Sequence, residues 1–298
     1  MRSLDEIFLS YYLKERNRIY KNGISLAHYT NILPGYLILK SKEIWLRNIT
    51  KMNDYMEVKW GLELFKIFLY DNDMLLYRRL TTILAKAHKD NNYWEQVIDE
   101  LIDNFYEKYA INTYILSLTE NINKNLNEDL FNKFCRDEGL IFVFNSNYYG
   151  KFNKILNLSR VAYFNGLGFK NKFIDFIKNI ENNVDLIKKN KLENVEEAFK
   201  KAIFYAILSI KHPTFTIENE WRVVFCKEFI TDNDIDKIII KDYVPFNSRL
   251  EKIYKIKLEQ LDLNVLVNKI MYRSNNKEYT ELLKNEFQKW HVSKLEKI

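Results

Sequence analysis

Two carboxylates and a guanidinium alternate with other residues in the segment IENEWRVVF, which runs from Ile217 to Phe225. This spacing predicts a strand with Glu218, Glu220 and Arg222 on one face and packing residues on the other. An unpaired buried carboxylate costs several kcal/mol, so such a trio is solvated, internally paired or lining a cleft. Only the third of these arrangements, a cleft lined by the three side chains, would indicate a functional site.

A second polar cluster, His28-Tyr29-Thr30, lies where a predicted strand over Ile24–Tyr29 ends. A neutral imidazole at that position can donate a hydrogen bond to a ligand hydroxyl, and Tyr29 can stack or pack. A structural histidine, satisfied within the protein, is the alternative.

Further polar side chains follow on two other predicted strands. Ser117 and Thr119 share one face of the strand in ILSLTEN, where they can meet a phosphate or a ribose or can simply face solvent. Trp45, Arg47 and Asn48 give the preceding strand a mixed polar surface.

Several common catalytic and binding motifs are absent from the sequence. It contains no GxxxxGK[ST], GxGxxG, HExxH or paired CxxC, so a P-loop, a Rossmann fingerprint and a zinc site are unsupported. The four histidines leave a Ser-His-Asp arrangement open, but no nucleophile elbow anchors one. The two cysteines, Cys135 and Cys226, read as buried small hydrophobes rather than a disulfide framework.

The composition is that of a globular chain. It has 298 residues, 47% of them hydrophobic, with only 7 Gly and 3 Pro, so long disordered linkers are not expected. The net charge of +6 is spread without a block of like charges and permits an anionic partner without demanding one. No apolar run approaches the roughly 20 residues that span a bilayer, and the N-terminus lacks a signal-peptide core, which makes the cytoplasm the default location.

The elements that must position these residues alternate irregularly between strands and helices. Apolar spacing predicts helices over residues 3–20, 54–109 (several), 173–187, 195–210 and 279–290. Short β-branched or aromatic runs predict strands over residues 24–29, 44–47, 114–118, 140–144, 160–164, 217–225, 237–240 and 253–258. We therefore expect an α+β fold with a mostly antiparallel β core, forming a single domain over residues 1–298 with a helical insertion at about 54–109.

The order of the motifs resembles the bacterial domain-of-unknown-function family 2971. The shared pieces are HYT, IWLRN, MND with a following glutamate (Glu57), a short S-x-T strand, GLIFVF and the E-x-E-W-R strand, over about residues 26–260. The family's proline after LND is Tyr55 here. The tryptophan and histidine of its LWSHYA block are missing around Leu130–Phe134.

The layout is also similar to that of ADP-ribosyltransferases, including the type that modifies DNA. The resemblance implies that His28 binds the adenosine-side ribose of NAD and that Thr30 and Ser117 steady the nicotinamide half. Glu220 would bind the nicotinamide ribose and stabilise the oxocarbenium-like cation, and Glu218 would orient or deprotonate an acceptor. The candidate catalytic residues are thus Glu220 and Glu218. The candidate NAD-binding residues are His28, Tyr29, Thr30, Ser117, Arg222 and Asn48.

The resemblance predicts an NAD-dependent ADP-ribosyltransferase or NAD glycohydrolase, acting as a bacterial toxin or anti-phage effector on nucleic acid or on protein. A non-catalytic module that binds a nucleotide, nucleic acid or a protein partner is the main alternative. A third is a hydrolase or nuclease that uses Asp54, Glu57, Glu218 and Glu220 around Mg²⁺ or Mn²⁺.

Overall fold

A computed structural model describes residues 3–52, 55–71, 74–121, 127–145, 156–230, 235–246, 249–261, 266–290 and 294–298. The protein is an α+β fold built on a mostly antiparallel sheet, as the sequence predicts. Within the described residues, no helix combines the length and apolarity needed to cross a bilayer.

The described strands are β1 (Ser25–Asn31), β2 (Glu43–Asn48), β3 (Thr113–Asn121), β4 (Gly139–Phe144), β5 (Asn157–Arg160), β6 (Ala162–Tyr163), β7 (Ile210–Lys211), β8 (Glu220–Cys226), β9 (Ile239–Phe246), β10 (Arg249–Lys257), β11 (Val267–Arg273) and β12 (Leu295–Lys297). The described α-helices are α1 (Leu4–Phe8), α2 (Ser10–Lys21), α3 (Ile32–Ser41), α4 (Tyr55–Lys66), α5 (Met74–Ala87), α6 (Asn91–Asp103), α7 (Glu128–Cys135), α9 (Gly166–Glu181), α10 (Val184–Lys188), α11 (Leu192–Leu208), α12 (Ile235–Ile238) and α14 (Lys277–Gln288). Short 3-10 or π turns, η1 (Ile49–Lys51), η2 (Ile67–Asp71), η3 (Phe105–Tyr109), η4 (Ala110–Asn112), η6 (Pro213–Glu218), η7 (Lys227–Phe229) and η8 (Leu258–Leu261), connect some of them.

The sheet forks at β3. One edge of β3 pairs with β8 along Thr113–Thr119. Its other edge pairs with β2 only at Tyr114 and Ile115, and with β1 only from Thr119 to Asn121. Strands β1 and β2 therefore diverge along the middle of β3, and each continues into its own arm: β1 into β4, β11 and β12, and β2 into β10 and β9.

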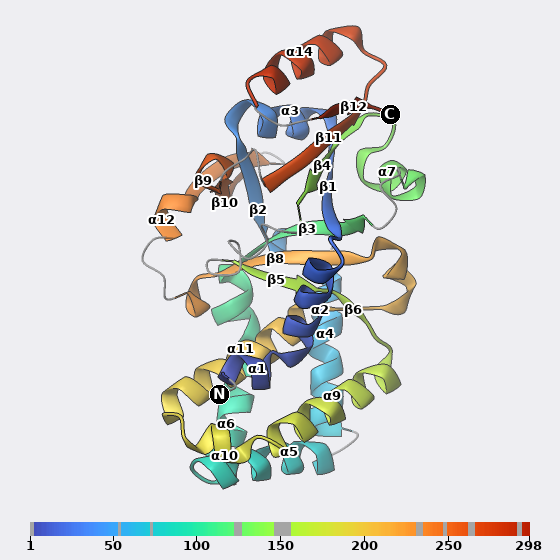
Figure 1. Cartoon of the computed structure of the whole chain (residues 1–298). Coiled ribbons are helices and arrows are strands. Elements are labelled where there is room, and N and C mark those ends of the chain that lie inside the picture. Colours follow the sequence, from blue (N-terminus) through green and yellow to red (C-terminus); the bar gives the residue numbers. More distant parts are fainter. Residues whose placement is uncertain are drawn as a thin grey trace.

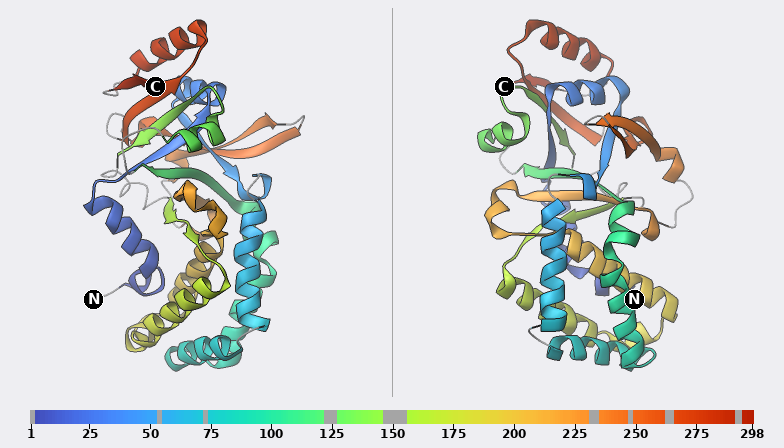
Figure 2. Two further views of the ribbon diagram at one scale, coloured as in Figure 1. Left: turned by 90° about the vertical axis from the view of Figure 1, so that its right-hand side faces the viewer. Right: turned by 180° about the vertical axis from the view of Figure 1, so that it is seen from behind.

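The helices divide into two groups around this sheet (Figures 1 and 2). Helices α1, α2, α4, α5, α6 and α9–α11 form one half of the molecule, whose apolar core reaches Val224 and Cys226 on β8. A second core, containing Trp221 and Val223, lies on the other face of β8 and is covered by α3 and α14. Strand β8 is consequently buried on both faces.

Most predicted elements are present, with local corrections. The helix predicted over residues 173–187 is two helices, because the backbone leaves helical geometry at Asn183 between α9 and α10. The strand predicted over residues 237–240 begins only at Ile239, after the short helix α12. Strand β11 was not predicted from the sequence.

The strand predicted from Ile217 begins only at Glu220. Pro213 opens the 3-10 turn η6, which ends with Glu218, and Asn219 then takes a left-handed conformation with φ 42°. Asparagine tolerates that conformation better than most residues do. The prediction that Glu218 shares a strand face with Glu220 and Arg222 is therefore wrong, although Glu220 and Arg222 do share one.

Candidate functional site

A cavity of about 290 Å³ lies at the fork of the sheet. It is lined by Ala27, His28, Tyr29, Trp45, Arg47, Met52, Ile115, Leu116, Ser117, Leu118, Thr119, Phe134, Glu218 and Glu220. These residues come from β1, β2, β3, α7, the segment after η1, and the chain around the start of β8. The two polar clusters found in the sequence, separated by almost two hundred residues, thus meet in one cavity.

His28 spans the fork. Its Nδ1 lies 3.1 Å from the Ser117 carbonyl oxygen; since that oxygen can only accept, Nδ1 is the donor. Burial lowers the pKa of His28, and the hydrogen bond to Ser117 offsets this only in part. A neutral ring with its proton on Nδ1 leaves Nε2 as an acceptor, so His28 offers a ligand an acceptor rather than the expected donor.

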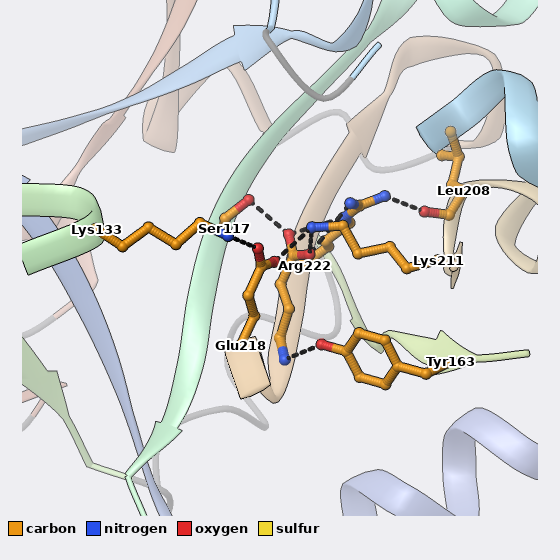
Figure 3. Close-up of polar contacts among 8 residues, drawn as sticks. Ser117, Lys133, Tyr163, Leu208, Lys211, Glu218 and Arg222 are labelled. Atoms are coloured by element: carbon orange, nitrogen blue, oxygen red, sulfur yellow. Dashed lines mark hydrogen bonds and ion pairs between the residues drawn. The ribbon is translucent and has the colours of Figure 1, made fainter. Parts of the chain in front are cut away.

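Glu220 is held by groups from three other segments, most of which are drawn in Figure 3. Its Oε1 accepts from Ser117 Oγ at 2.7 Å and from Arg222 Nε at 2.9 Å. Its Oε2 lies 2.7 Å from Lys211 Nζ and 3.1 Å from an Arg222 Nη. Its backbone N–H donates to Tyr163 Oη at 2.8 Å.

The carboxylate of Glu220 stays ionised although the residue is only 3% exposed. Burial alone would raise its pKa, but the charges and hydrogen bonds of Arg222 and Lys211 outweigh burial and lower the pKa from 4.5 to about 2. The site therefore presents a fixed anion in a fixed position.

Glu218 bridges two lysines, although it lies outside the strand (Figure 3). Its Oε2 accepts from the buried Lys211 Nζ at 2.6 Å, and its Oε1 accepts from Lys133 of α7. The aromatic ring of Phe215 lies 5.5 Å from both ammonium groups. Three cations, Lys133, Lys211 and Arg222, thus lie around the two carboxylates of Glu218 and Glu220.

The structure brings some of the predicted residues to the cavity and leaves others away from it. His28, Tyr29, Ser117, Glu218 and Glu220 all line it, as does Thr119 from the same strand face as Ser117.

Thr30, Arg222 and Asn48 do not line the cavity. Thr30 lies two residues after His28 on β1, where it is buried and pairs with Leu140 of β4. Arg222 supports Glu220, and one of its Nη atoms donates to the Leu208 carbonyl.

Asn48 has a structural role instead of the predicted ligand contact. Its amide donates to the carbonyls of Ile111 and Thr113 at 2.8 and 3.1 Å, and its Oδ1 accepts from the Thr50 backbone at 3.0 Å. These bonds close the start of β3 against the end of β2, so the side chain is not available to a ligand.

Lys211 is the main residue that sequence reasoning missed. Its side chain is 1% exposed and contacts both Glu218 and Glu220. The sequence does contain a hint of this pairing. Lys211 precedes the His212-Pro213 turn and the two glutamates follow it, so the turn can bring these opposite charges together. The aromatic wall of the cavity, Trp45 and Phe134, was also not assigned a role there.

The carboxylates of the site are occupied by cations of the protein itself. Among the described residues, no group of three or more His, Cys, Asp or Glu is arranged to hold a metal ion. Asp54 and the side chain of Glu57, which the metal hypothesis requires, lie outside the part that the structure describes.

Comparison with known proteins adds no relative. No protein-family model, no curated protein and no solved structure matches this chain.

Proposed function

We propose that this protein cleaves the nicotinamide–ribose bond of NAD, as an ADP-ribosyltransferase or an NAD glycohydrolase. The observation that carries the proposal is the convergence of His28 and Glu220 on one cavity at the fork of an antiparallel sheet. A cavity of about 290 Å³ is at the lower end of the range for ligand pockets, so it suits the nicotinamide–ribose half of NAD better than the whole molecule.

Each group of the site has a role in that reaction. Trp45 and Phe134 supply flat apolar surfaces for the nicotinamide ring. The acceptor nitrogen of His28 takes a hydrogen bond from a ribose hydroxyl. Arg47 lines the cavity beside its partner Glu251, and its guanidinium can donate hydrogen bonds to the pyrophosphate.

Glu220 acts on the charge that develops as the bond breaks. The bonding electron pair leaves with nicotinamide, and the ribose becomes an oxocarbenium-like cation beside the ionised carboxylate. Water or an acceptor nucleophile then forms the new bond to the ribose carbon and loses its proton. Glu218 lies next to this position and can receive the proton once the Lys133 contact opens.

Nicotinamide release from NAD, followed by chromatography, tests the proposal. Replacing Glu220 with Gln removes the aimed negative charge, so we expect a loss of about 10²- to 10³-fold in rate. The matched control is Glu259→Gln, which changes an exposed glutamate that pairs with Lys42 away from the cavity, and it should leave the rate unchanged. A wild type that releases no nicotinamide in the presence of candidate acceptors, or a Glu220→Gln variant as active as the wild type, would contradict the mechanism.

A non-catalytic nucleotide-binding module is the second candidate, and one observation favours it. Arg222 and Lys211 already neutralise Glu220, which weakens the field that it can direct at a cation. In that case NAD or another nucleotide raises the melting temperature, and mass spectrometry recovers the ligand unchanged. If the ligand is nucleic acid, its affinity falls steeply with salt.

A further inference from the structure

A second cavity, also of about 290 Å³, lies in the helical half of the molecule. It is bounded mainly by α2, α9 and α11, with aromatic rings such as Tyr11, Phe169 and Phe173 along its walls. Ala202 and Ala206, one turn apart on α11, keep it open, since larger side chains there would fill it. Protein interiors are otherwise close-packed, so a hollow of this size with a ring-lined wall suits an apolar molecule.

The polar groups of this cavity are concentrated on two helices. Ser10 and Lys14 lie one turn apart on α2, and both line the cavity. Lys172 on α9 lines it as well but shares its charge with Asp175, whose Oδ2 is 3.5 Å from Lys172 Nζ. Within the described part of the chain, no carboxylate pairs with Lys14, which is exposed. The cavity therefore combines an apolar interior with one net positive charge and a nearby hydroxyl.

We propose that this cavity binds a medium-chain carboxylate, a molecule with one apolar chain and one anionic head. The chain would occupy the space between Phe169, Phe173 and Ala206, where its burial removes apolar surface from water. The head would lie at Lys14 and accept a hydrogen bond from Ser10. A single cation suits a monoanionic head better than a phosphomonoester or a polyphosphate, because both of these carry more than one negative charge.

This site is separate from the one proposed for NAD. No residue in the described part of the chain lines both cavities. The two cavities are linked through neighbouring residues. Ile210 lines the second cavity, and the next residue, Lys211, pairs with Glu220 at the first. The proposal does not depend on the reaction at the first cavity, and binding alone tests it.

Titration calorimetry of the full chain with decanoate, below its micelle concentration, is the direct experiment. We expect saturable binding and a rise in melting temperature that depends on decanoate concentration. Decanol, which has the same chain without the charge, should bind several-fold more weakly. Ala206→Phe fills the cavity and should abolish binding.

A second variant, Lys14→Glu, tests the proposal if Ala206→Phe fails to fold. It changes only an exposed side chain, so it should fold like the wild type. An exposed ion pair is worth up to about 1 kcal/mol, or about fivefold in affinity, so this reversal should weaken decanoate binding by about that factor or more and leave decanol unaffected. Lys188→Glu, the same change at an exposed lysine that does not line the cavity, is the matched control. The absence of saturable decanoate binding by the wild type, or equal binding by the wild type and Lys14→Glu, would overturn the proposal.

Discussion

Replacing Lys211 with Met should destabilise the protein more than any exposed lysine substitution. Lys211 Nζ lies 2.6 Å from Glu218 Oε2 and 2.7 Å from Glu220 Oε2, and the lysine is 1% exposed. Methionine keeps the unbranched shape of the side chain but removes the charge. Glu218 then retains Lys133, and Glu220 retains Arg222 and Ser117.

The size of the effect follows from burial. Removing one partner of a buried ion pair costs about 3–5 kcal/mol, because the other charge is left in a medium of low polarity. The structure allows a second estimate of the same order. The fall in the Glu220 pKa from 4.5 to about 2, at 1.36 kcal/mol per pH unit, corresponds to about 3 kcal/mol, and Lys211 supplies part of it. We therefore expect Lys211→Met to cost about 3 kcal/mol at pH 7.

The destabilisation caused by Lys211→Met should depend on pH in a definite direction. A depressed pKa contributes stability that is present above the unfolded value of about 4.5 and is lost as pH falls toward 2. Without Lys211 the pKa of Glu220 rises, so the variant has less of this contribution to lose. The difference in unfolding free energy between wild type and Lys211→Met should be largest at pH 7 and shrink steadily toward pH 3.

Urea unfolding at a series of pH values measures both quantities. Lys188→Met is the control and should change stability by less than about 0.5 kcal/mol, because that lysine is exposed. The double variant Lys211→Met with Glu218→Gln should be more stable than Lys211→Met alone, because it also removes one of the two buried carboxylates that pair with Lys211. A loss below about 1 kcal/mol, or one that does not change between pH 7 and pH 3, would refute the reasoning.

Three further predictions concern other parts of the structure. A Cβ at Gly61 would lie 2.2 Å from the Ile207 carbonyl oxygen, so Gly61→Ala should force α4 from α11 and cost about 1–3 kcal/mol or more in urea unfolding; no measurable loss would mean that the helices are farther apart. Trp221→Phe removes the 3.1 Å hydrogen bond from Trp221 Nε1 to the buried Glu120 and should cost about 1–3 kcal/mol by the same measurement, against a near-neutral result if solvent reaches that carboxylate. Burial lowers the pKa of His28 from its ordinary value of 6.5, so any loss of NAD affinity with acid, measured by calorimetry on the slow Glu220→Gln variant, should have its midpoint below pH 6.5; a midpoint above pH 7 would contradict a neutral acceptor.

Much of the fold could be predicted because its main elements carry strong local patterns. All six residues of β4 are buried, and their continuous apolar run in GLIFVF is typical of a fully buried strand. Helix α11 shows apolar residues at helical spacing, although it ends at Leu208, and Ile210, predicted as its last apolar residue, begins β7 instead. The break between α9 and α10 has no glycine or proline to mark it, and only two asparagines separate the helices.

The candidate site could be predicted only in part, because its long-range pairings are not visible in local patterns. The hydroxyl of Ser117 and the ring of His28 were recognised from residue type and strand position. The burial of Lys211 was not, because lysine is normally exposed and its partners are identified only once the turn between them has folded. Asn48 was misassigned, because an amide that satisfies backbone carbonyls looks the same in sequence as one that waits for a ligand.

The divergence of β1 and β2 has a mechanical consequence. Among the described strands, only β8 pairs with β3 from Leu116 to Leu118, so the two arms of the sheet can move apart there without breaking one of these interstrand ladders. In native-state hydrogen exchange, amides shared by β3 and β8 should be among the slowest of the molecule, and those where the arms meet β3 should open first. A bulky ligand would then enter as the two arms move slightly apart, and the hydrogen bond from the His28 imidazole to the Ser117 carbonyl would have to open for it.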